Sequence, residues 1–129
     1  MRLLNIIIAN TADPPIYRQI ADQIKTAVFR GEIKPGELLP SVRMLANELQ
    51  ISVITTRKAY EELEQEGLIV SLPGKGTFIS SKSPELLNEA RFNAVEERVC
   101  ETIAFAKRMG VGREKLKEII NFFMEDENR

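Results

Sequence analysis

The sequence contains no histidine, and its 129 residues include a single cysteine, Cys100. Histidine is the commonest metal ligand and the usual proton carrier near neutral pH, so its absence argues against a metal centre and against most acid–base enzymes. One cysteine permits neither an intramolecular disulfide nor a zinc cluster, which is typical of proteins in a reducing cytosol. We therefore expect a cytoplasmic protein that is not an enzyme and that needs no metal or cofactor.

Long apolar runs are also missing. A helix that spans a membrane needs about 20 predominantly apolar residues, and no stretch of this chain approaches that length. The opening RLLNIIIAN, residues 2–10, is short, is interrupted by Asn5 and is followed by NTADPP instead of the small residues of a cleavage site. We interpret it as a strand or arm, and we expect a soluble protein with no membrane partner.

An excess of positive charge is missing as well. The net charge is −1 and the isoelectric point is about 5.6, whereas nucleic-acid-binding modules are usually basic. Residues 1–83 carry ten Lys and Arg against nine Asp and Glu, and residues 84–129 carry eight against ten. A nucleic-acid partner therefore requires local clustering of the cations.

Apolar periodicity predicts three short helices in the first half of the chain. The first covers residues 15–30 and stops near Gly31; the second covers residues 41–49 and the third residues 52–66. Ser41 and Ser52 supply hydroxyls that can cap the free N–H groups of the second and third helices, and Gly67 supplies a left-handed end for the third. The third helix is expected to turn four side chains inward, namely Thr56, Ala59, Tyr60 and Leu63.

The runs on either side of residues 73–76, Pro-Gly-Lys-Gly, are rich in β-forming residues and predict a hairpin over residues 68–80. Between the first two helices, GEIKPGELLP leaves room for a loop with at most a short strand at residues 37–39. Two short helices, a tight turn and a hairpin form a winged helix-turn-helix. The predicted fold is α+β, with this domain over residues 1–83.

Residues 84–129 predict a tail of two helices separated by GVG at residues 110–112. The tail is too short to enclose its own core, so its apolar faces must be buried on the first domain or on a second copy of the chain. We favour an isologous dimer, because one winged helix reads too short a site. Cys100 is expected to be a buried small hydrophobe. The dimerising residues are expected to be Phe92, Val95, Val99, Ile103, Leu116, Ile120 and Phe123.

Residues 15–80 resemble the DNA-binding domain of the GntR family of bacterial transcriptional regulators. The motifs that carry the resemblance occur in order: Ile16-Tyr17 with Gln19-Ile20, Gly31, Pro35-Gly36, Leu39-Pro40-Ser41 with Arg43, Leu45-Ala46, residues 52–59, Glu64, Glu66-Gly67-Leu68 and Gly74-Lys75-Gly76-Thr77. The short tail resembles that of the YtrA-like branch, whose members use it mainly to dimerise. The tail shows no recognisable pocket, so a small-molecule effector between subunits stays open and none is assigned.

The resemblance implies DNA contacts from three places. These are Arg43, the start of the third helix at Ser52, Val53, Thr55 and Arg57, and the wing tip at Gly74 with its neighbours Lys75 and Gly76. Lys58 extends the basic end of the helix. Many members have arginine in place of Val53 and a valine core residue in place of Thr56, so one of the usual hydrogen-bond donors is missing here.

The stretch SVITT at residues 52–56 starts the third helix with β-branched residues, which are weak helix formers. A recognition helix enters the major groove by this end, where short side chains let the backbone and the helix dipole approach phosphates. The hydroxyls can donate to phosphates or base edges, and the methyls of Val53 and Ile54 can contact thymine. Glu61 and the acidic residues after it fall beyond the basic end.

These observations predict a homodimeric regulator that binds a palindromic DNA operator in a sequence-specific manner, with repression as the favoured outcome. The alternative is a winged helix that serves as a protein-interaction module without specific DNA binding, which the acidic isoelectric point and Val53 favour. A phosphate-binding loop at PGKGTF is disfavoured, because Ile69 stands where the Walker pattern requires glycine.

Overall fold

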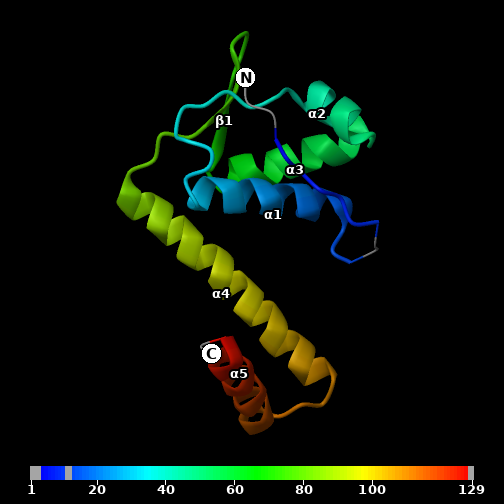
Figure 1. Cartoon of the computed structure of the whole chain (residues 1–129), viewed down its shortest axis with the longest axis vertical. Helices are drawn as coiled ribbons and strands as arrows, with labels where there is room; N and C mark the ends of the chain where they lie inside the picture. The colour runs from blue at the N-terminus through cyan, green and yellow to red at the C-terminus, as the bar shows by residue number, and fades with distance from the viewer. Residues whose placement is uncertain (1–3, 11–12, 128–129) are drawn as a thin grey trace. The chain divides into compact units, whose positions relative to one another are not determined.

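The computed structural model describes residues 4–10 and 13–127 and contains five helices and one hairpin among them (Figure 1). The elements are α1 Ile16–Phe29, α2 Val42–Leu49, α3 Val53–Gln65, β1 Ile69–Leu72, β2 Gly76–Ile79, α4 Pro84–Arg108 and α5 Arg113–Glu127. The chain divides into two compact units, and the boundary along the sequence lies between Leu87 and Asn88. We call them the winged unit and the tail unit and describe each by itself.

The helix starts of the winged unit are set by serine caps. Ser41 Oγ accepts a hydrogen bond of 3.1 Å from the Met44 N–H, and Ser52 Oγ accepts one of 3.0 Å from the Thr55 N–H. Each hydroxyl satisfies one of the backbone donors that a helix start leaves free, so α2 and α3 begin directly after the serines. This is how the sequence pattern predicted them.

The helix ends use left-handed residues. Gly67 follows α3 with φ of 76°, as expected from the glycine. After α2, however, the left-handed position is occupied by Gln50, with φ of 55°. Its side-chain amide donates a 2.7 Å hydrogen bond to the Asn47 carbonyl, which satisfies one of the acceptors exposed at the helix end.

The core of the winged unit lies between α1, α2 and α3 and extends to the hairpin. Thr56, Ala59, Tyr60 and Leu63 of α3 are all buried, as predicted from their spacing. Opposite them lie apolar side chains from the other elements, among them Ile20, Ile24, Leu39, Leu45 and Ile79. At the end of this layer, Lys25 Nζ of α1 lies 2.8 Å from Glu66 Oε2, directly after α3.

Tyr60 ties α3 to the segment that leads into α2. Its hydroxyl donates a 2.7 Å hydrogen bond to the Pro40 carbonyl in the protein interior. Burial, and to a smaller extent the Glu48 carboxylate, raises the pKa of this hydroxyl well above its ordinary value. The bond fixes the residue before Ser41, and with it the start of α2.

We predict that Tyr60→Phe lowers the free energy of unfolding by about 1 to 3 kcal/mol, because it leaves the buried Pro40 carbonyl without a donor. Stability of the wild type should also fall as pH rises past about 10, since the unfolded chain releases the Tyr60 proton more readily than the folded chain. The phenylalanine variant should lose that part of the alkaline dependence. Urea unfolding at pH 7 and pH 10.5 checks both effects, and Tyr17→Phe, on a partly exposed tyrosine, is the matched control.

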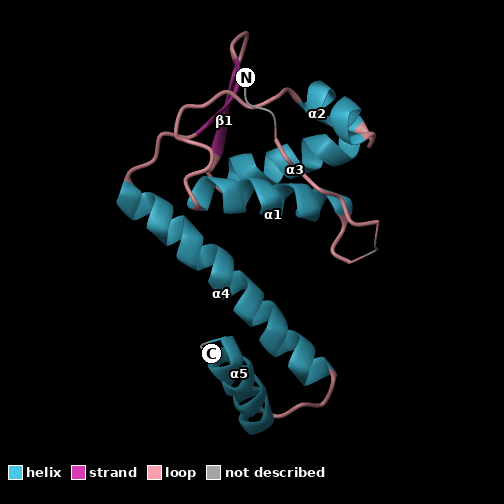
Figure 2. Ribbon diagram, viewed as in Figure 1, coloured by secondary structure: helices cyan, strands magenta, loops and turns pink. Residues whose placement is uncertain are grey.

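The wing is an antiparallel hairpin in which Ile69 pairs with Ile79 and Leu72 with Gly76 (Figure 2). Its tip is a turn closed by a 2.9 Å hydrogen bond from the Lys75 N–H to the Leu72 carbonyl. Pro73 and Gly74, with φ of 77° at the glycine, occupy the two central positions, as a type II turn requires. The short strand expected near residues 37–39 is present as one bridge, between Leu38 and Phe78.

The residues of the predicted arm that the structure describes, 4–10, form an extended segment against α1 and no regular strand; residues 2–3 lie outside the described part. Two glutamine amides of α1 hold the segment. Gln19 accepts from the Ala9 N–H and donates to its carbonyl, and Gln23 does the same for Ile7. The glutamines thereby take the place of a neighbouring strand.

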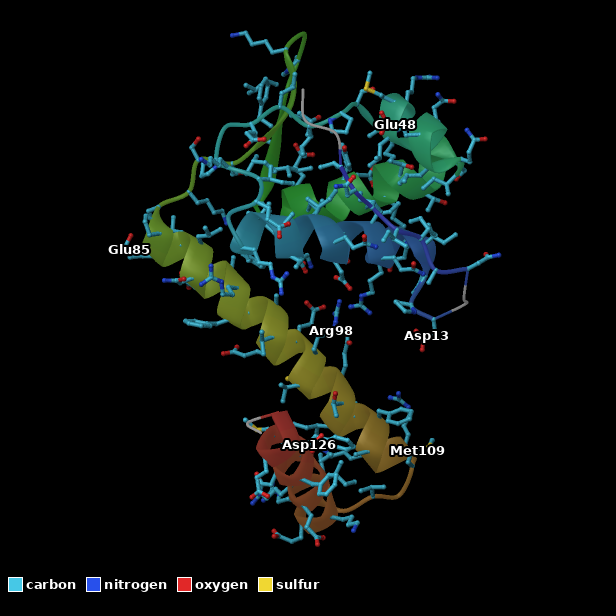
Figure 3. The ribbon with its side chains drawn as sticks, viewed as in Figure 1. Asp13, Glu48, Glu85, Arg98, Met109 and Asp126 are labelled. Atoms are coloured by element: carbon cyan, nitrogen blue, oxygen red, sulfur yellow. The ribbon has the colours of Figure 1, made fainter. Side chains whose placement is uncertain are left out.

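In the tail unit, α5 turns back beside α4 (Figure 3), and side chains of both helices line a groove of about 530 Å³. The expectation that the tail has no recognisable pocket was therefore wrong, because helical spacing does not reveal how closely two helices approach. None of the helices among the described residues is long and apolar enough to cross a membrane.

Most apolar side chains of the tail unit are exposed in the single chain. Ala106 is buried, whereas Ile103 remains 41% exposed and Phe123 60%. The other large apolar residues left exposed here include Phe92, Val95, Val99, Phe105, Met109, Ile119, Ile120, Phe122 and Met124. Cys100, which we expected to be buried, is exposed as well, because it lies about 100° around α4 from its neighbour Val99 in the groove.

Candidate nucleic-acid interface

The N-terminal half of α3 presents an exposed face on the side opposite its buried residues. Ile54 is 77% exposed, and Arg57 and Lys58 are exposed beside it. Val53 and Thr55 are half-buried at the edges of this face. A single exposed apolar side chain is normal on a protein surface, so what distinguishes this face is the pair of exposed cations beside Ile54. The sequence predicts only an apolar contact between Ile54 and thymine, through its methyl groups. Its exposure makes it a leading candidate for DNA contact.

The hydroxyls of Ser52 and Thr55, at the start of α3, differ in whether they retain a hydrogen-bond donor for DNA. Ser52 Oγ accepts from the Thr55 N–H at 3.0 Å and donates to Thr55 Oγ1 at 2.9 Å. Its hydroxyl proton is therefore occupied within the cap. Thr55 receives that bond and retains its own hydroxyl proton. Of the two predicted hydroxyl contacts, Thr55 is the one with a free donor, and Ser52 acts first as the helix cap.

The cations of this region are not neutralised by neighbouring carboxylates. Arg43, exposed in the first turn of α2, and Arg57 form no ion pair within the described parts of the chain. Two of the acidic residues beyond the basic end of α3, Glu64 and Glu66, have structural partners instead. Glu66 pairs with Lys25, and Glu64 Oε1 accepts a 3.1 Å hydrogen bond from the Ser71 N–H. The positive charges therefore lie in the first half of α3 and the negative charges beyond them, although the net charge of the whole chain is −1.

Lys58 has a partner that the sequence did not reveal. Its Nζ lies 4.1 Å from the centroid of the Tyr17 ring, which belongs to the first turn of α1. This is a cation–π contact between the predicted recognition helix and a helix that no DNA contact was assigned to. Spacing along the sequence could not indicate it, because the two residues meet only when α1 and α3 pack.

The wing tip contains the three predicted residues Gly74, Lys75 and Gly76, and all are exposed. Gly74 occupies a left-handed position with open space around it. Gly76 has φ of 120°, a backbone conformation that other residues rarely adopt, and a Cβ there would also lie 2.8 Å from the terminal methyl Cδ1 of Leu38. Lys75 stands between them as a cation at the end of the hairpin.

Comparison with known proteins identifies the winged unit. Residues 16–79 match the family described as bacterial regulatory proteins, gntR family. Over 112 residues the chain is 42% identical to the HTH-type transcriptional repressor YtrA of Bacillus subtilis, with 87% of this chain and 86% of that repressor aligned. It is also 36% identical over 111 residues to YhcF of the same species, an uncharacterised HTH-type regulator, with 86% of this chain and 91% of that protein aligned.

Solved structures agree. The GntR-family transcription factor YtrA from Sulfolobus acidocaldarius superposes with a TM-score of 0.57 at 32% identity, covering 96% of this chain and all of that one. The DNA-binding domain of AraR, determined in complex with its operator ORX1, gives a TM-score of 0.53 at 28% identity and covers 62% of this chain and 100% of that one. The chain belongs to the GntR family of bacterial transcriptional regulators, as a YtrA-like member with a winged helix-turn-helix DNA-binding domain.

Proposed function

We propose that this protein is a cytoplasmic repressor that binds a palindromic operator as a homodimer. The observation that carries the proposal is the exposed start of α3, where Ile54 and Arg57, which has no ion pair among the described residues, project beside the serine cap. Relatives of the same length include a repressor, and a related domain is known bound to an operator. Binding of the dimer to a promoter would exclude polymerase from the same DNA.

On this proposal, α3 enters the major groove by its N-terminal end. The Thr55 hydroxyl donates to a phosphate or base edge, and the methyls of Val53 and Ile54 contact thymine. Val53 cannot replace the hydrogen bonds of the arginine that many relatives have, so part of the specificity moves to apolar contacts. Arg43 binds the flanking backbone, and the wing tip at Gly74, Lys75 and Gly76 reaches the adjacent minor groove.

The dimer forms through the tail unit. A monomer rarely exposes an apolar surface as large as the one on α4 and α5, and a second copy of the same surface covers it by two-fold symmetry. The predicted contacts are Phe92, Val95, Val99, Ile103, Leu116, Ile120 and Phe123. Linking two winged units in this way multiplies the affinity for a site with two matching halves.

The experiment selects the operator and then measures binding to it. The protein is used to select double-stranded DNA from a random pool, and native upstream fragments are tested beside it. The bound DNA should contain a two-fold repeat. Fluorescence anisotropy at physiological salt should show tighter binding to that DNA than to random duplex. Binding no tighter to any selected fragment than to random duplex would contradict the proposal. A reporter gene placed behind the operator gives the direction of regulation. Expression that rises when the gene for this protein is deleted supports repression, and expression that falls indicates activation.

We predict that Arg43→Ala and Arg57→Ala each change DNA binding in one of two distinguishable ways. A phosphate contact should reduce the slope of log affinity against log salt by about one unit per contact, uniformly across sequences. A base contact should instead cost about 1 to 3 kcal/mol on the operator and relax specificity at one base pair. Arg30→Ala removes an exposed cation at the C-terminal end of α1, away from the start of α3, and is the control that should leave both quantities unchanged.

The second candidate function is a winged helix that binds another protein without reading DNA. The acidic isoelectric point and the apolar Val53 favour it. That function predicts partner binding with little salt dependence and no effect of Arg57→Ala. The salt titration above separates the two.

A further inference from the structure

The DNA interface of the proposed function is confined to α2, α3 and the wing, yet a side chain of α1 reaches one of its cations. Lys58 Nζ lies 4.1 Å from the centre of the Tyr17 ring. Tyr17 is in the first turn of α1, a helix that otherwise supplies core residues, and its ring is partly exposed. The contact therefore lies at the surface, beside the exposed start of α3.

Lys58 makes this contact although carboxylates are available on its own helix. Glu61 and Glu62 stand three and four residues further along α3, the spacing at which charged side chains of a helix are neighbours. Within the described parts of the chain, no ion pair forms between Lys58 and an acidic residue. An ion pair would neutralise the lysine, whereas a ring face attracts the ammonium and leaves its net charge in place.

The ring also restricts a flexible side chain. A lysine carries four rotatable bonds, and holding its ammonium at a phosphate costs conformational entropy when the free side chain is disordered. The ring occupies one side of the ammonium and Lys58 is exposed, so N–H donors remain for a phosphate. The ammonium is then placed before any DNA arrives.

The direction of the two helices puts this placement at the end of α3 that enters the groove. Tyr17 near the start of α1 meets Lys58 in the first half of α3, while Lys25 near the end of α1 meets Glu66 beyond the end of α3. The two helices therefore run in the same direction, with both starts on one side (Figure 1). The basic residue at the start is held by an aromatic ring, and the acidic one at the far end is held by a lysine.

We propose that Tyr17 is a positioning residue for DNA binding: its ring holds the Lys58 ammonium, with its charge unneutralised, at the α1 edge of the recognition helix for contact with a backbone phosphate. This inference rests on the proposed function, because it assigns a task within the same interface. It adds α1 to the elements that determine operator affinity.

The test compares ring-retaining and ring-deleting variants in the full-length protein. Tyr17→Phe keeps the ring and should bind the selected operator like the wild type, with the same salt dependence. Tyr17→Leu should weaken binding by roughly two- to fivefold per winged unit, the range expected for an exposed cation–π contact. Lys58→Met should lower the salt slope by about one per winged unit, and Tyr17→Leu should add no further loss in the Lys58→Met background.

A second measurement needs no DNA. In the free protein, the ring should shift the NMR signals of the Lys58 ε-methylene protons upfield, equally in the wild type and Tyr17→Phe, and Tyr17→Leu should abolish the shift. If Tyr17→Leu does not fold, Lys58→Met and Tyr17→Phe still decide the matter by the salt slope and the ring shift.

The outcomes separate this inference from the proposed function. A wild type that binds no selected DNA better than random duplex overturns the function and the role of Tyr17 together. A wild type that binds its operator while Tyr17→Leu binds equally well, or while Tyr17→Phe loses as much as Tyr17→Leu, overturns the role of Tyr17 alone. An equal loss from Tyr17→Leu with and without Lys58 also overturns it, because the ring would then act on the fold and not through the lysine.

Discussion

Ile103→Asp should convert the protein from a dimer to a monomer and lower its apparent affinity for the operator by about 100- to 10,000-fold. Ile103 lines the groove between α4 and α5 and remains 41% exposed in the single chain, so a symmetric partner would cover it. Two-fold symmetry places the new carboxylate in the interface twice, and each buried charge without a partner is costly. Each winged unit alone retains only the weak binding of one half-site.

Sedimentation velocity across a range of protein concentrations measures the first effect, and anisotropy with the selected operator measures the second. Asn93→Asp adds the same charge at an exposed position of α4 outside the groove and is the matched control. It should leave both the sedimentation and the affinity unchanged. A variant at Ile103 that still sediments as a dimer would show that the tail surface has another purpose, and a wild type that sediments only as a monomer would refute the dimer itself.

The sequence predicts the winged unit well because local chemistry determines its element boundaries. Ser41 and Ser52 are hydroxyl caps at the positions where α2 and α3 start, and Gly67 is the left-handed residue after α3. Spacing alone also placed Thr56 and Leu63 in the core, since a helix repeats its buried face every three or four residues. These features depend on a few neighbouring residues, and a single sequence contains them.

Features that depend on contacts between distant elements could not be predicted in this way. The ring of Tyr17 under Lys58 joins residues 41 positions apart, and only the packing of α1 on α3 brings them together. The end of α2 is another case. Gln50 occupies the left-handed position that glycine usually takes, and its side-chain amide donates a hydrogen bond to the helix end. The tail is a third case. Its apolar stripe could be recognised in the sequence, but the groove that the stripe lines and the exposure of Cys100 could not.

The candidate site was predicted as a set of residues, and the structure separates the tasks within the set. Ser52, predicted both as the cap of α3 and as a DNA contact, has its hydroxyl hydrogen-bonded within the cap, and Gly76 stands at a φ of 120° that other residues rarely adopt. Thr55, Arg43 and Arg57 remain available for contact. Whether each of them reaches DNA stays a prediction for the salt and specificity measurements.

Leu63→Ala should lower the free energy of unfolding of the winged unit by about 2 to 5 kcal/mol. Leu63 has no exposed surface and fills the space between α3 and the other helices, so its truncation removes apolar burial and leaves a cavity. A loss of that size is a large part of the 5 to 15 kcal/mol typical of a small protein. Gln65→Ala, an exposed change on the same helix, should stay within about 0.5 kcal/mol of the wild type.

Tyrosine fluorescence during urea unfolding is the appropriate measurement, because the sequence has no tryptophan and both tyrosines, Tyr17 and Tyr60, lie in the winged unit. The signal therefore follows this unit and not the tail. Operator binding by Leu63→Ala should fall only in proportion to the folded fraction, so the affinity divided by that fraction should match the wild type. A larger loss would mean that Leu63 also sets the angle at which α3 leaves the core, and that recognition depends on the core beneath the helix as well as on its exposed residues.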